Sequence, residues 1–387
     1  MAKKLLFFVF LFIIISSTAQ NNAHAVFVAG ADLYQTYRIP AMVTLKDGSI
    51  IAFAEGRVNN AGDFGDVDIV MKKSNDKGTS WSKLSTIVNY EKLQAGNPAP
   101  VVDLTDPKYP NGRIFLFYNT GNGHENDLRM GMGLREVWYI TSTDGGVKWS
   151  RPTNITLQVH KPYQTNKNPA YHFAEQWRSY ANTPGHAIQF KQGKYKGRIY
   201  VAGNHSAGYP QKNYADYDVH GFYTDDHGAS FHLSNNLNLP GSNESMAVEL
   251  SDNKLMINAR NQSGSPRNRI VALSSDGGVS WDTSYYDNQL VDPVCQGSIL
   301  DVYLNNKKAI IFCNNNNSEK RDQLTLRISY DEGKTWSNNW ILAESKPGFK
   351  GDYTGYSDLI QIDNKSIGVL YELNNYQQIV FEIIDIH

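Results

Sequence analysis

One short pattern recurs five times along the chain and constrains its fold more than any other feature. The pattern reads Ser, any residue, Asp, any residue, Gly, any two residues and then an aromatic residue, with Thr opening and Phe closing the third copy. The aspartate can accept hydrogen bonds from the backbone of its own turn, and the glycine takes a positive φ without a Cβ clash. We therefore expect each copy, called a turn motif below, to form the hairpin turn of one small sheet. The copies are Ser74–Trp81, Ser142–Trp149, Thr224–Phe231, Ser274–Trp281 and Ser329–Trp336.

The spacing of the turn motifs predicts a radial arrangement of sheets. Successive motif aspartates lie 50 to 82 residues apart, with a mean near 64. Repeats of this kind, flanked by strand-like stretches such as residues 67–71, are typical of β-propellers. No long apolar stripe of helical period occurs after the N-terminal segment, so helices should be few and short. We predict an all-β, six-bladed β-propeller in which one blade lacks the motif.

The N-terminus has the pattern of a secretory signal peptide. Lys3 and Lys4 precede an apolar run over residues 5–15, and small residues follow up to Ala19. We expect a signal peptide over residues 1–19 and one propeller domain over residues 20–387. A secreted or periplasmic protein without a membrane anchor after cleavage is the corresponding prediction.

Composition excludes some classes of partner. The formal net charge is −1 and charged residues make up 19% of the chain, so no basic field for nucleic acid is present. Cys295 and Cys313 are the two cysteines, and either one disulfide or two buried thiols fits an exported chain. No metal-binding motif such as His-Glu-x-x-His occurs, and we predict no metal and no cofactor. A closed propeller covers its own sheet edges, and we expect a monomer.

The turn motifs resemble the Asp-boxes of sialidases, and the segment Tyr37-Arg38-Ile39-Pro40 resembles the arginine-isoleucine-proline motif that opens their catalytic domains. The resemblance implies that Arg38 is the first of three arginines that bind the carboxylate of a sialic acid. Ile257-Asn258-Ala259-Arg260-Asn261 is similar to the second arginine site. Arg321 is taken as the third in preference to Arg327, which alternation places within a strand. Arg57 resembles a fourth family arginine, near the carboxylate or the acid loop.

The same resemblance assigns the reacting groups. Residues 62–70 are similar to the loop that carries the sialidase general acid/base, and matching back from the strand places that role on Asp63, with Asp66 and Asp68 as rivals. Gly355-Tyr356-Ser357-Asp358-Leu359 looks like the nucleophile site, so Tyr356 is preferred to Tyr353 and Tyr371. Glu244 looks like the partner that accepts its proton. A neutral phenol avoids the repulsion that a carboxylate nucleophile would meet at a carbon already bearing a carboxylate.

One further binding residue is implied by resemblance. Residues 97–103 look like the approach to a carboxylate that contacts the sugar, which points to Asp103, whereas Asp103 as a simple turn cap is the alternative. Whether Tyr171, His172 and Trp177 line the aglycone side is left open.

The resemblance as a whole implies a retaining exo-α-sialidase that acts on sialylated glycans of glycoproteins, gangliosides or oligosaccharides. A trans-sialidase or intramolecular trans-sialidase on the same scaffold is the nearest alternative. A sialic-acid-binding propeller without turnover is the alternative from a different class.

Overall fold

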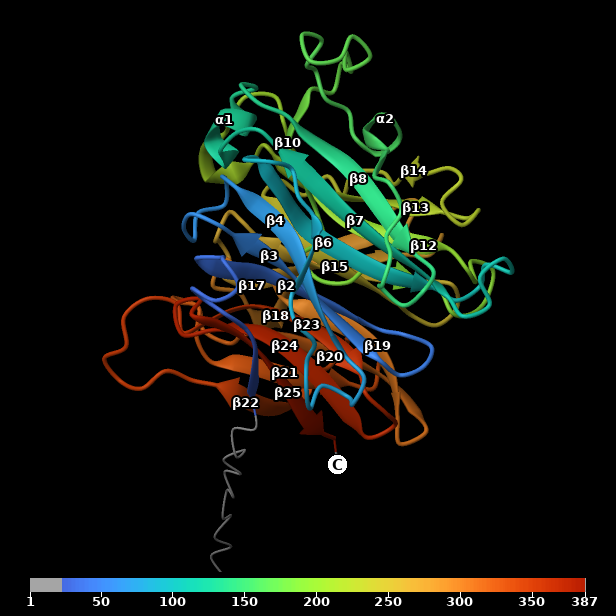
Figure 1. The fold of residues 1–387 in the computed structure, drawn as a ribbon, viewed down its shortest axis with the longest axis vertical. Coiled ribbons are helices and arrows are strands. Elements are labelled where there is room, and N and C mark those ends of the chain that lie inside the picture. Colours follow the sequence, from blue (N-terminus) through green and yellow to red (C-terminus); the bar gives the residue numbers. More distant parts are fainter. Residues whose placement is uncertain (1–22, 387) are drawn as a thin grey trace, which may run out of the picture.

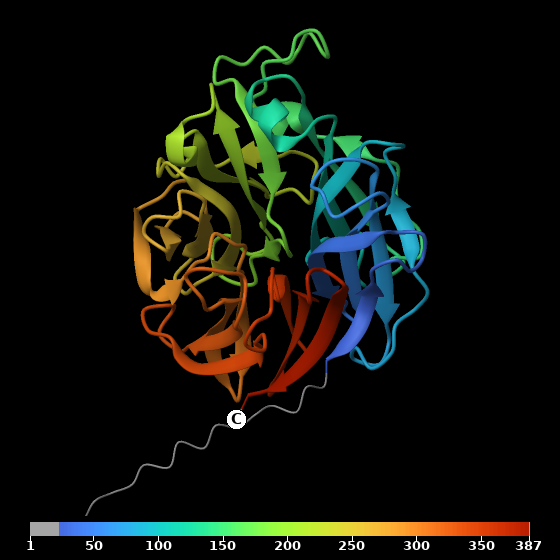
Figure 2. The ribbon, with the colours of Figure 1, turned by 90° about the vertical axis from the view of Figure 1, so that its left-hand side faces the viewer.

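Antiparallel β-sheets stand in a ring around a common axis in the computed structural model of the chain, which describes residues 23–386 (Figures 1 and 2). The predicted signal peptide over residues 1–19 lies outside the described residues. The all-β propeller arrangement predicted from the turn motifs is confirmed.

Four of the sheets are separate, each of four or five strands. The first has β10 (Trp177–Asn182), β11 (Ile188–Gln189), β12 (Ile199–Ala207), β13 (Tyr217–Thr224) and β14 (His232–Leu233). The second has β15 (Ser242–Glu249), β16 (Leu255–Asn261), β17 (Asn268–Ser274) and β18 (Thr283–Val291). The third has β19 (Ser298–Leu304), β20 (Lys307–Asn315), β21 (Leu324–Ser329) and β22 (Ser337–Ala343). The fourth has β23 (Thr354–Gln361), β24 (Ser366–Leu373), β25 (Gln378–Asp385) and β1 (His24–Val28).

The remaining eight strands form one continuous sheet, which corrects the prediction of six separate blades. Its first half contains β2 (Thr36–Thr44), β3 (Ile50–Arg57), β4 (Val67–Ser74) and β5 (Ser85–Val88). Its second half contains β6 (Gln94–Asp103), β7 (Arg113–Gly121), β8 (Arg135–Ser142) and β9 (Thr153–Asn154). The halves join through a parallel pairing of β4 with β6 at Val67 and Gln94. Because backbone hydrogen bonds cross between the halves there, the two antiparallel meanders count as one sheet.

Each turn motif joins the last two strands of its unit, as in β4 to β5 and β8 to β9. In the first motif, Asp76 accepts the Ser80 backbone N–H at 2.9 Å and the Ser74 hydroxyl at 2.8 Å. The Ser74 hydroxyl in turn accepts the N–H of Gly78, whose φ is +90°. The same aspartate-to-backbone bond recurs in all five motifs, which confirms the predicted turn chemistry; the other four acceptors are Asp144, Asp226, Asp276 and Asp331.

The aromatic residue that ends a motif packs against the neighbouring unit of the ring. Trp81 lies edge-on to Phe381 of β25, and Trp149 lies edge-on to Phe53 of β3. Phe231, which replaces Trp in the third motif, contacts Phe117 of β7 in the same edge-on manner. These turns therefore stabilise contacts between sheets as well as within them.

The unit without a turn motif is the one that closes the ring. Its fourth strand, β1, comes from the N-terminal end of the described chain and pairs antiparallel with β25, with Phe27 opposite Ile379. No hairpin joins these two strands because they lie at opposite ends of the sequence, so the motif has no place there. This arrangement accounts for the predicted blade without a motif.

Helices are short, as predicted. They are α1 (Glu125–Arg129), α2 (Thr156–Val159) and one 3₁₀ turn (Lys212–Tyr214). Among residues 23–386, no helix has the length and apolar character needed to cross a lipid bilayer. Cys295 and Cys313 are both buried free thiols.

Candidate active site

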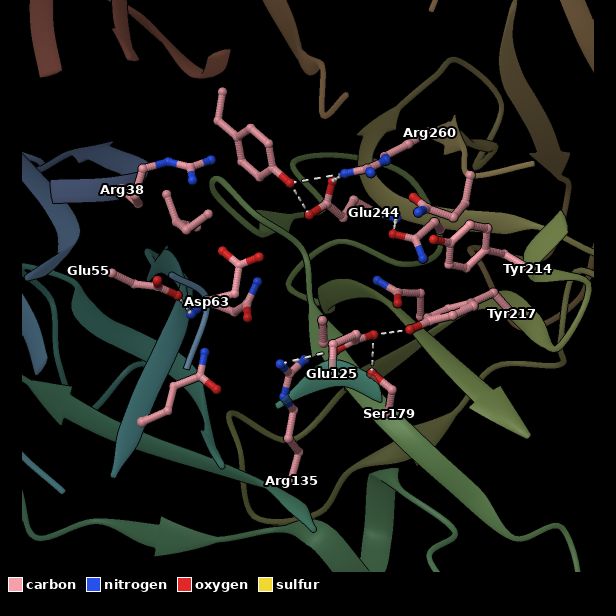
Figure 3. Close-up of a pocket in the computed structure, with 18 of the residues that line it drawn as sticks. Arg38, Glu55, Asp63, Glu125, Arg135, Ser179, Tyr214, Tyr217, Glu244 and Arg260 are labelled. Carbon is pink, nitrogen blue, oxygen red and sulfur yellow. Dashed lines mark hydrogen bonds and ion pairs between the residues drawn. The ribbon is translucent and has the colours of Figure 1, made fainter. Parts of the chain in front are cut away.

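A polar cavity of about 250 Å³ opens among the sheets (Figure 3). Seven of the eight predicted site residues lie in its wall, drawn from both ends of the sequence; they are Arg38, Arg57, Asp63, Glu244, Arg260, Arg321 and Tyr356. The other wall residues are Ile39, Glu55, Gln94, Asn97, Glu125, Asn126, Arg135, Ser179, Ala181, Asn204, Tyr214, Tyr217, Asn243 and Gln262.

The first strands of five units interrupt their regular pairing at the cavity. The register shifts once in each of β2, β6, β10, β15 and β23, between residues 38 and 41, 96 and 99, 177 and 180, 242 and 245, and 354 and 357. At two of these bulges, Ile39 and Asn97 take a positive φ. A bulge turns a side chain away from the regular alternation of a strand. Arg38, Asn97, Glu244 and Tyr356 lie at these irregular positions and line the cavity.

Glu372 fixes the orientation of Arg38. Its carboxylate accepts Arg38 Nε–H at 2.7 Å and the backbone N–H groups of Ile39 and Tyr356, each at 2.9 Å. Burial lowers the pKa of the Arg38 guanidinium, but Glu372, with Tyr376 and Tyr356, raises it more, so the pKa lies above its usual range. The Arg38 guanidinium carbon lies 3.8 Å from the ring centre of Tyr376 and 5.4 Å from that of Tyr356. Arg38 therefore stays charged, and its Nη groups remain available to a ligand.

Tyr356 and Glu244 share a hydrogen bond within the cavity wall. The Tyr356 hydroxyl donates to Glu244 Oε1 and accepts from Arg260 Nη1 at 3.1 Å. Arg260 also pairs with Glu244 Oε2 at 2.8 Å. Burial raises the pKa of Tyr356 well above its ordinary 10.0, and the charge of Glu244 raises it further, whereas Arg260 and Arg321 lower it. The phenol is therefore neutral at neutral pH, with a proton acceptor already in contact.

The third arginine, Arg321, also lies close to Tyr356. Arg321 Nη1 donates to the Tyr376 hydroxyl at 3.1 Å and lies 3.7 Å from the carboxylate of Asp352. Its guanidinium carbon is 5.7 Å from the ring centre of Tyr356. Arg38, Arg260 and Arg321 thus surround one phenol, and a small anion placed beside that phenol would meet three guanidinium groups.

Arg57 and Asp63 form the adjacent wall. Arg57 pairs with the buried carboxylate of Glu55 at 2.6 Å through Nη2, and its Nη1 donates to Asp63 at 2.9 Å. Asp63 lies in the loop between β3 and β4, and its side chain is 75% exposed toward the open cavity. Desolvation raises the pKa of Asp63, but Arg57 and then Arg38 lower it more, so its pKa falls below the ordinary 3.8.

The rival residues lie elsewhere. Arg327 is buried within β21 and donates to Asn314 at 2.9 Å. Asp68 is buried in β4, where the Tyr34 hydroxyl donates to it at 2.7 Å. Tyr371 is fully buried and donates to Glu382 at 3.1 Å, and Tyr353 packs against Phe349. The remaining rival, Asp66, is absent from the cavity wall. The wall also lacks the three residues left open for the aglycone side, Tyr171, His172 and Trp177.

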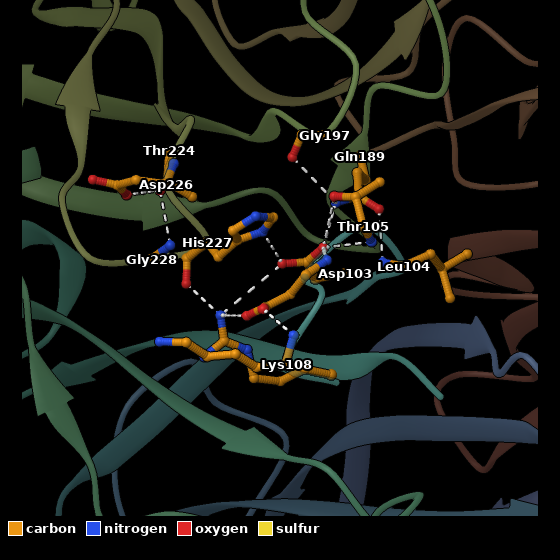
Figure 4. Close-up of polar contacts among 12 residues, drawn as sticks. Asp103, Leu104, Thr105, Lys108, Gln189, Gly197, Thr224, Asp226, His227 and Gly228 are labelled. Carbon is orange, nitrogen blue, oxygen red and sulfur yellow. Dashed lines mark hydrogen bonds and ion pairs between the residues drawn. The ribbon is translucent and has the colours of Figure 1, made fainter. Parts of the chain in front are cut away.

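Asp103 is absent from the cavity wall and lies among the polar contacts drawn in Figure 4, which corrects the prediction that it contacts the sugar. It lies at the far end of β6 from Gln94 and Asn97, and nine extended residues span roughly 30 Å. Asp103 is fully buried and accepts hydrogen bonds from Thr105 N–H at 2.9 Å and Gln189 Nε2 at 2.7 Å. It therefore has the turn-capping role that was the alternative. Asn97, at the start of the same segment, is the residue that lines the cavity.

Asp103, Asp106 and His227 also bring their ligand atoms close together, in the way a metal site would. His227 Nδ1 lies 2.8 Å from Asp103 Oδ2, and Arg113 Nη2 lies 3.1 Å from Asp106 Oδ2. The Arg113 guanidinium already supplies positive charge to the two carboxylates, so the cluster is explained as a structural link between β6 and the third turn motif.

Sequence reasoning missed several residues that line the cavity or hold its arginines. Glu55 and Glu372 orient Arg57 and Arg38, yet each reads in the sequence as an ordinary residue of an alternating strand. Tyr376 lies in the turn after β24 and contacts two of the arginines, Arg38 and Arg321. Glu125, Arg135, Ser179 and Tyr217 form a polar wall across the cavity from Arg38 and Arg260 (Figure 3). No local pattern marks these four residues, because they come from four separate elements, α1, β8, β10 and β13.

The model of the BNR repeat-like domain matches residues 48–369 of the chain. The chain belongs to this family. Among curated relatives, the BNR-family chain is 29% identical over 366 residues to a sialidase of Micromonospora viridifaciens, covering 89% of this chain and 51% of that protein. It is 28% identical over 368 residues to an exo-alpha-sialidase of Arthroderma benhamiae, covering 89% of this chain and 79% of that protein. The chain therefore spans about half the length of the Micromonospora protein.

Solved structures give the same fold. A Hadza microbial sialidase superposes with a TM-score of 0.76 and 26% identity, covering 94% of this chain and 68% of that one. A leech intramolecular trans-sialidase superposes with a TM-score of 0.70 at 17% identity, a similarity of fold alone. The propeller fold is thus shared with a protein named a sialidase and with one named an intramolecular trans-sialidase.

Proposed function

We propose that the chain is a retaining exo-α-sialidase that hydrolyses terminal sialic acids from glycoconjugates. The observation that carries the proposal is the Tyr356 phenol in contact with Glu244 and Arg260, inside a wall that also holds Arg38 and Arg321. The sialidase relatives named above support the same reaction class.

The three arginines suit a substrate that carries a carboxylate on the reacting carbon. In this proposal, Arg38, Arg260 and Arg321 bind the carboxylate through charge-assisted hydrogen bonds. Tyr356 then lies beside the anomeric carbon, because the three guanidinium groups surround its ring.

The reaction follows from the contacts of Tyr356. Glu244 accepts the phenolic proton while Tyr356 Oη attacks the anomeric carbon, and Asp63 gives a proton to the departing glycosidic oxygen. The product of this step is a covalent sialyl-tyrosine. Water, deprotonated by Asp63, then displaces Tyr356, which recovers its proton from Glu244. Two inversions at one carbon give net retention of configuration.

Asp63 must leave its ion pair with Arg57 before it can act as an acid. An acid must carry a proton, whereas Arg57 favours the ionised carboxylate in the free protein. We propose that Asp63, which is exposed on its loop, leaves Arg57 for the glycosidic oxygen when substrate fills the cavity.

The test uses a 3-fluorinated sialyl fluoride, which slows hydrolysis of the intermediate, followed by intact mass spectrometry and peptide mapping. A sialyl adduct on the Tyr356 peptide, with free sialic acid released from an ordinary sialoside, is the expected result. An anhydro or transferred product would assign the chain to transfer chemistry. Absence of both adduct and cleavage would overturn the catalytic proposal in favour of a binding propeller.

We also propose that the eight-stranded sheet acts as two blades joined at the Val67–Gln94 pair, which gives a ring of six. Two turn motifs lie within that sheet, one in each half, and support this division.

We also propose that the protein is exported as a monomer after removal of residues 1–19. N-terminal sequencing of the protein recovered outside the cytoplasm tests the removal, and its mass in solution tests the monomer.

A further inference from the structure

The segment that joins β18 to β19 packs against the proposed nucleophile. In this segment, Cys295 is buried against Tyr356 and Ile39, and Val294 O accepts a hydrogen bond from Arg321 Nη2 at 3.4 Å. The next residue, Gln296, is 1% exposed and is absent from the cavity wall. Gln296 therefore has no route to the substrate except through another residue.

The Gln296 amide pairs with both backbone groups of Ser357, the residue that follows Tyr356. Its Nε2 donates to Ser357 O at 2.9 Å, and its Oε1 accepts the Ser357 N–H at 3.0 Å. Nε2 also donates to Pro184 O at 3.1 Å, in the connection between β10 and β11. One buried side chain thus links β23 to two connections that belong to other sheets of the ring.

The place of Ser357 in its sheet explains why it needs such a partner. β23 is an edge strand of the fourth sheet and pairs there only with β24. In that pairing the register shifts between Thr354 and Ser357, at the bulge that carries Tyr356. A bulge interrupts the ladder of backbone hydrogen bonds. Gln296 supplies, at the open edge of β23, the two bonds that a neighbouring strand would make.

A buried ion pair anchors the segment from its other side. Asp292 accepts the backbone N–H groups of Cys295 and Asn261, each at 2.9 Å. Arg269 is fully buried, lies 3.3 Å from Asp292 and donates to Cys295 O. Breaking a buried ion pair is costly, so the main chain next to Gln296 is held firmly. The amide of Gln296 therefore restrains Ser357 rather than following it.

We propose that Gln296 is a positioning residue that fixes the reactive position of Tyr356. This step rests on the proposed function, in which Tyr356 Oη attacks the anomeric carbon. Gln296 holds the peptide after Tyr356, and Glu372 holds the peptide before it through the Tyr356 N–H at 2.9 Å. The bulge is thus fixed on both sides of the phenol. Arg38 and Arg260 pair with Glu372 and Glu244 instead, so loss of Gln296 should affect attack more than substrate binding.

The experiment measures kcat and KM with a 4-methylumbelliferyl sialoside. Gln296→Met keeps the length of the side chain and removes both bonds to Ser357. Displacement of a reacting group by about 1 Å costs about a hundredfold, so kcat should fall by about that factor while KM changes less than about twofold. The active fraction comes from the calorimetric stoichiometry of 2,3-unsaturated sialic acid, which carries the carboxylate but has no leaving group, and kcat is expressed per active site.

The chain offers a matched control at the opposite end of β23. Gln361 makes the same pair of bonds between the same two sheets, since its Nε2 donates to Tyr303 O at 2.6 Å and its Oε1 accepts the Tyr303 N–H at 3.1 Å. Gln361 lies outside the cavity wall and beyond the bulge. Gln361→Met should therefore keep wild-type kcat and KM.

A second variant tests the hydrogen bonds by pH. In Gln296→Glu, an ionised carboxylate still accepts the Ser357 N–H but donates to neither carbonyl oxygen, whereas the protonated carboxyl donates to one of them. Burial raises the pKa of such a carboxyl. The ratio of variant kcat to wild-type kcat, measured at the same pH and per active site, should therefore rise as the pH falls.

The outcomes separate this proposal from the proposed function. Wild-type kcat per active site in Gln296→Met, a raised KM at unchanged kcat, or an equal loss in Gln361→Met would overturn the positioning role and leave the sialidase function standing. A ratio for Gln296→Glu that does not change with pH would also overturn it, and this variant decides the question if Gln296→Met does not fold. No cleavage of the sialoside by the wild-type protein would instead reject the function.

Discussion

At the scale of single residues, the candidate site depends on buried carboxylates that hold its arginines. Glu372 is fully buried and binds Arg38 together with two backbone N–H groups, and Glu55 holds Arg57 and the N–H of Asn97. Each carboxylate offsets the desolvation of a guanidinium that faces the cavity. The site therefore retains a group of positive charges in the absence of a ligand.

Replacement of the proposed nucleophile tests the role of the Tyr356 hydroxyl. Tyr356→Phe removes the attacking oxygen and keeps the ring, so kcat should fall by at least about a thousandfold while the thermal transition changes little. Steady-state kinetics with a fluorogenic sialoside, beside circular dichroism, measures both. Tyr353→Phe is the matched control and should keep wild-type kcat. Retained activity in Tyr356→Phe would assign the nucleophile to another group.

The charge of Arg57 should control the pH dependence through Asp63. Because Arg57 lowers the pKa of Asp63, the protonated acid is lost at a lower pH than for an isolated aspartate. Arg57→Gln should raise that pKa and move the alkaline limb of kcat/KM to higher pH, at a lower overall rate. Arg57→Lys keeps the charge and should leave the limb near its wild-type position. If the alkaline limb of kcat/KM stays at the same pH in Arg57→Gln, then the pKa of Asp63 does not set that limb.

At the scale of elements, turns and bulges have separate tasks. The turn motifs fix hairpins and place an aromatic residue against the next unit, as Trp81 does against Phe381. The bulges in the first strands point side chains into the cavity. Stability and the candidate site thus rest on different parts of the same strands.

The turn aspartates should make stability sensitive to acid. The Ser80 hydroxyl lowers the pKa of Asp76 to about 2, and the Thr335 hydroxyl does the same for Asp331, against an ordinary 3.8. A folded pKa below the unfolded one gives stability that is present above 3.8 and is lost as pH falls toward 2. The double variant Asp76→Asn with Asp331→Asn should have a lower Tm at neutral pH and a smaller Tm loss over that interval.

Differential scanning calorimetry across this pH range measures the effect. Asp252→Asn is the control, because Asp252 is exposed and lies outside the turn motifs. An equal acid-induced Tm loss in the double variant and the wild type would contradict the assignment.

At the scale of the whole molecule, the ring is closed by strands from the two ends of the described chain. β1 pairs with β25, and Phe27 of β1 is fully buried against Tyr37 of β2, with ring centres 5.3 Å apart. A closed ring couples every unit to its neighbours, so loss of this contact should weaken the whole propeller.

Phe27→Ala should therefore lower the free energy of unfolding by about 3 to 5 kcal/mol, the usual cost of a large cavity in a core. Val28→Ala, one residue along and 40% exposed, should cost less than about 0.5 kcal/mol. Equilibrium unfolding in urea measures both. Similar small losses in the two variants would show that β1 contributes little to closure.

The sequence by itself determined the features that depend on local chemistry. A turn aspartate bonds to the backbone of its own four or five residues, so the five turns and the all-β class could be predicted from Asp76 and its counterparts. The resemblance of short motifs also identified seven cavity residues, because the residues around Arg38 and Tyr356 are themselves distinctive.

Only the tertiary structure decided what depends on bulges and on contacts between distant segments. The bulge of β6 places Asn97 in the cavity wall. The direction of β6 carries Asp103 to the end of the strand that lies away from the cavity. The polar wall of the cavity brings together Glu125, Arg135, Ser179 and Tyr217 from α1, β8, β10 and β13. Glu372 contacts Arg38 across 334 positions of sequence. The continuous eight-stranded sheet likewise rests on one pairing between strands. Such contacts form only when the ring closes, and no local pattern encodes them.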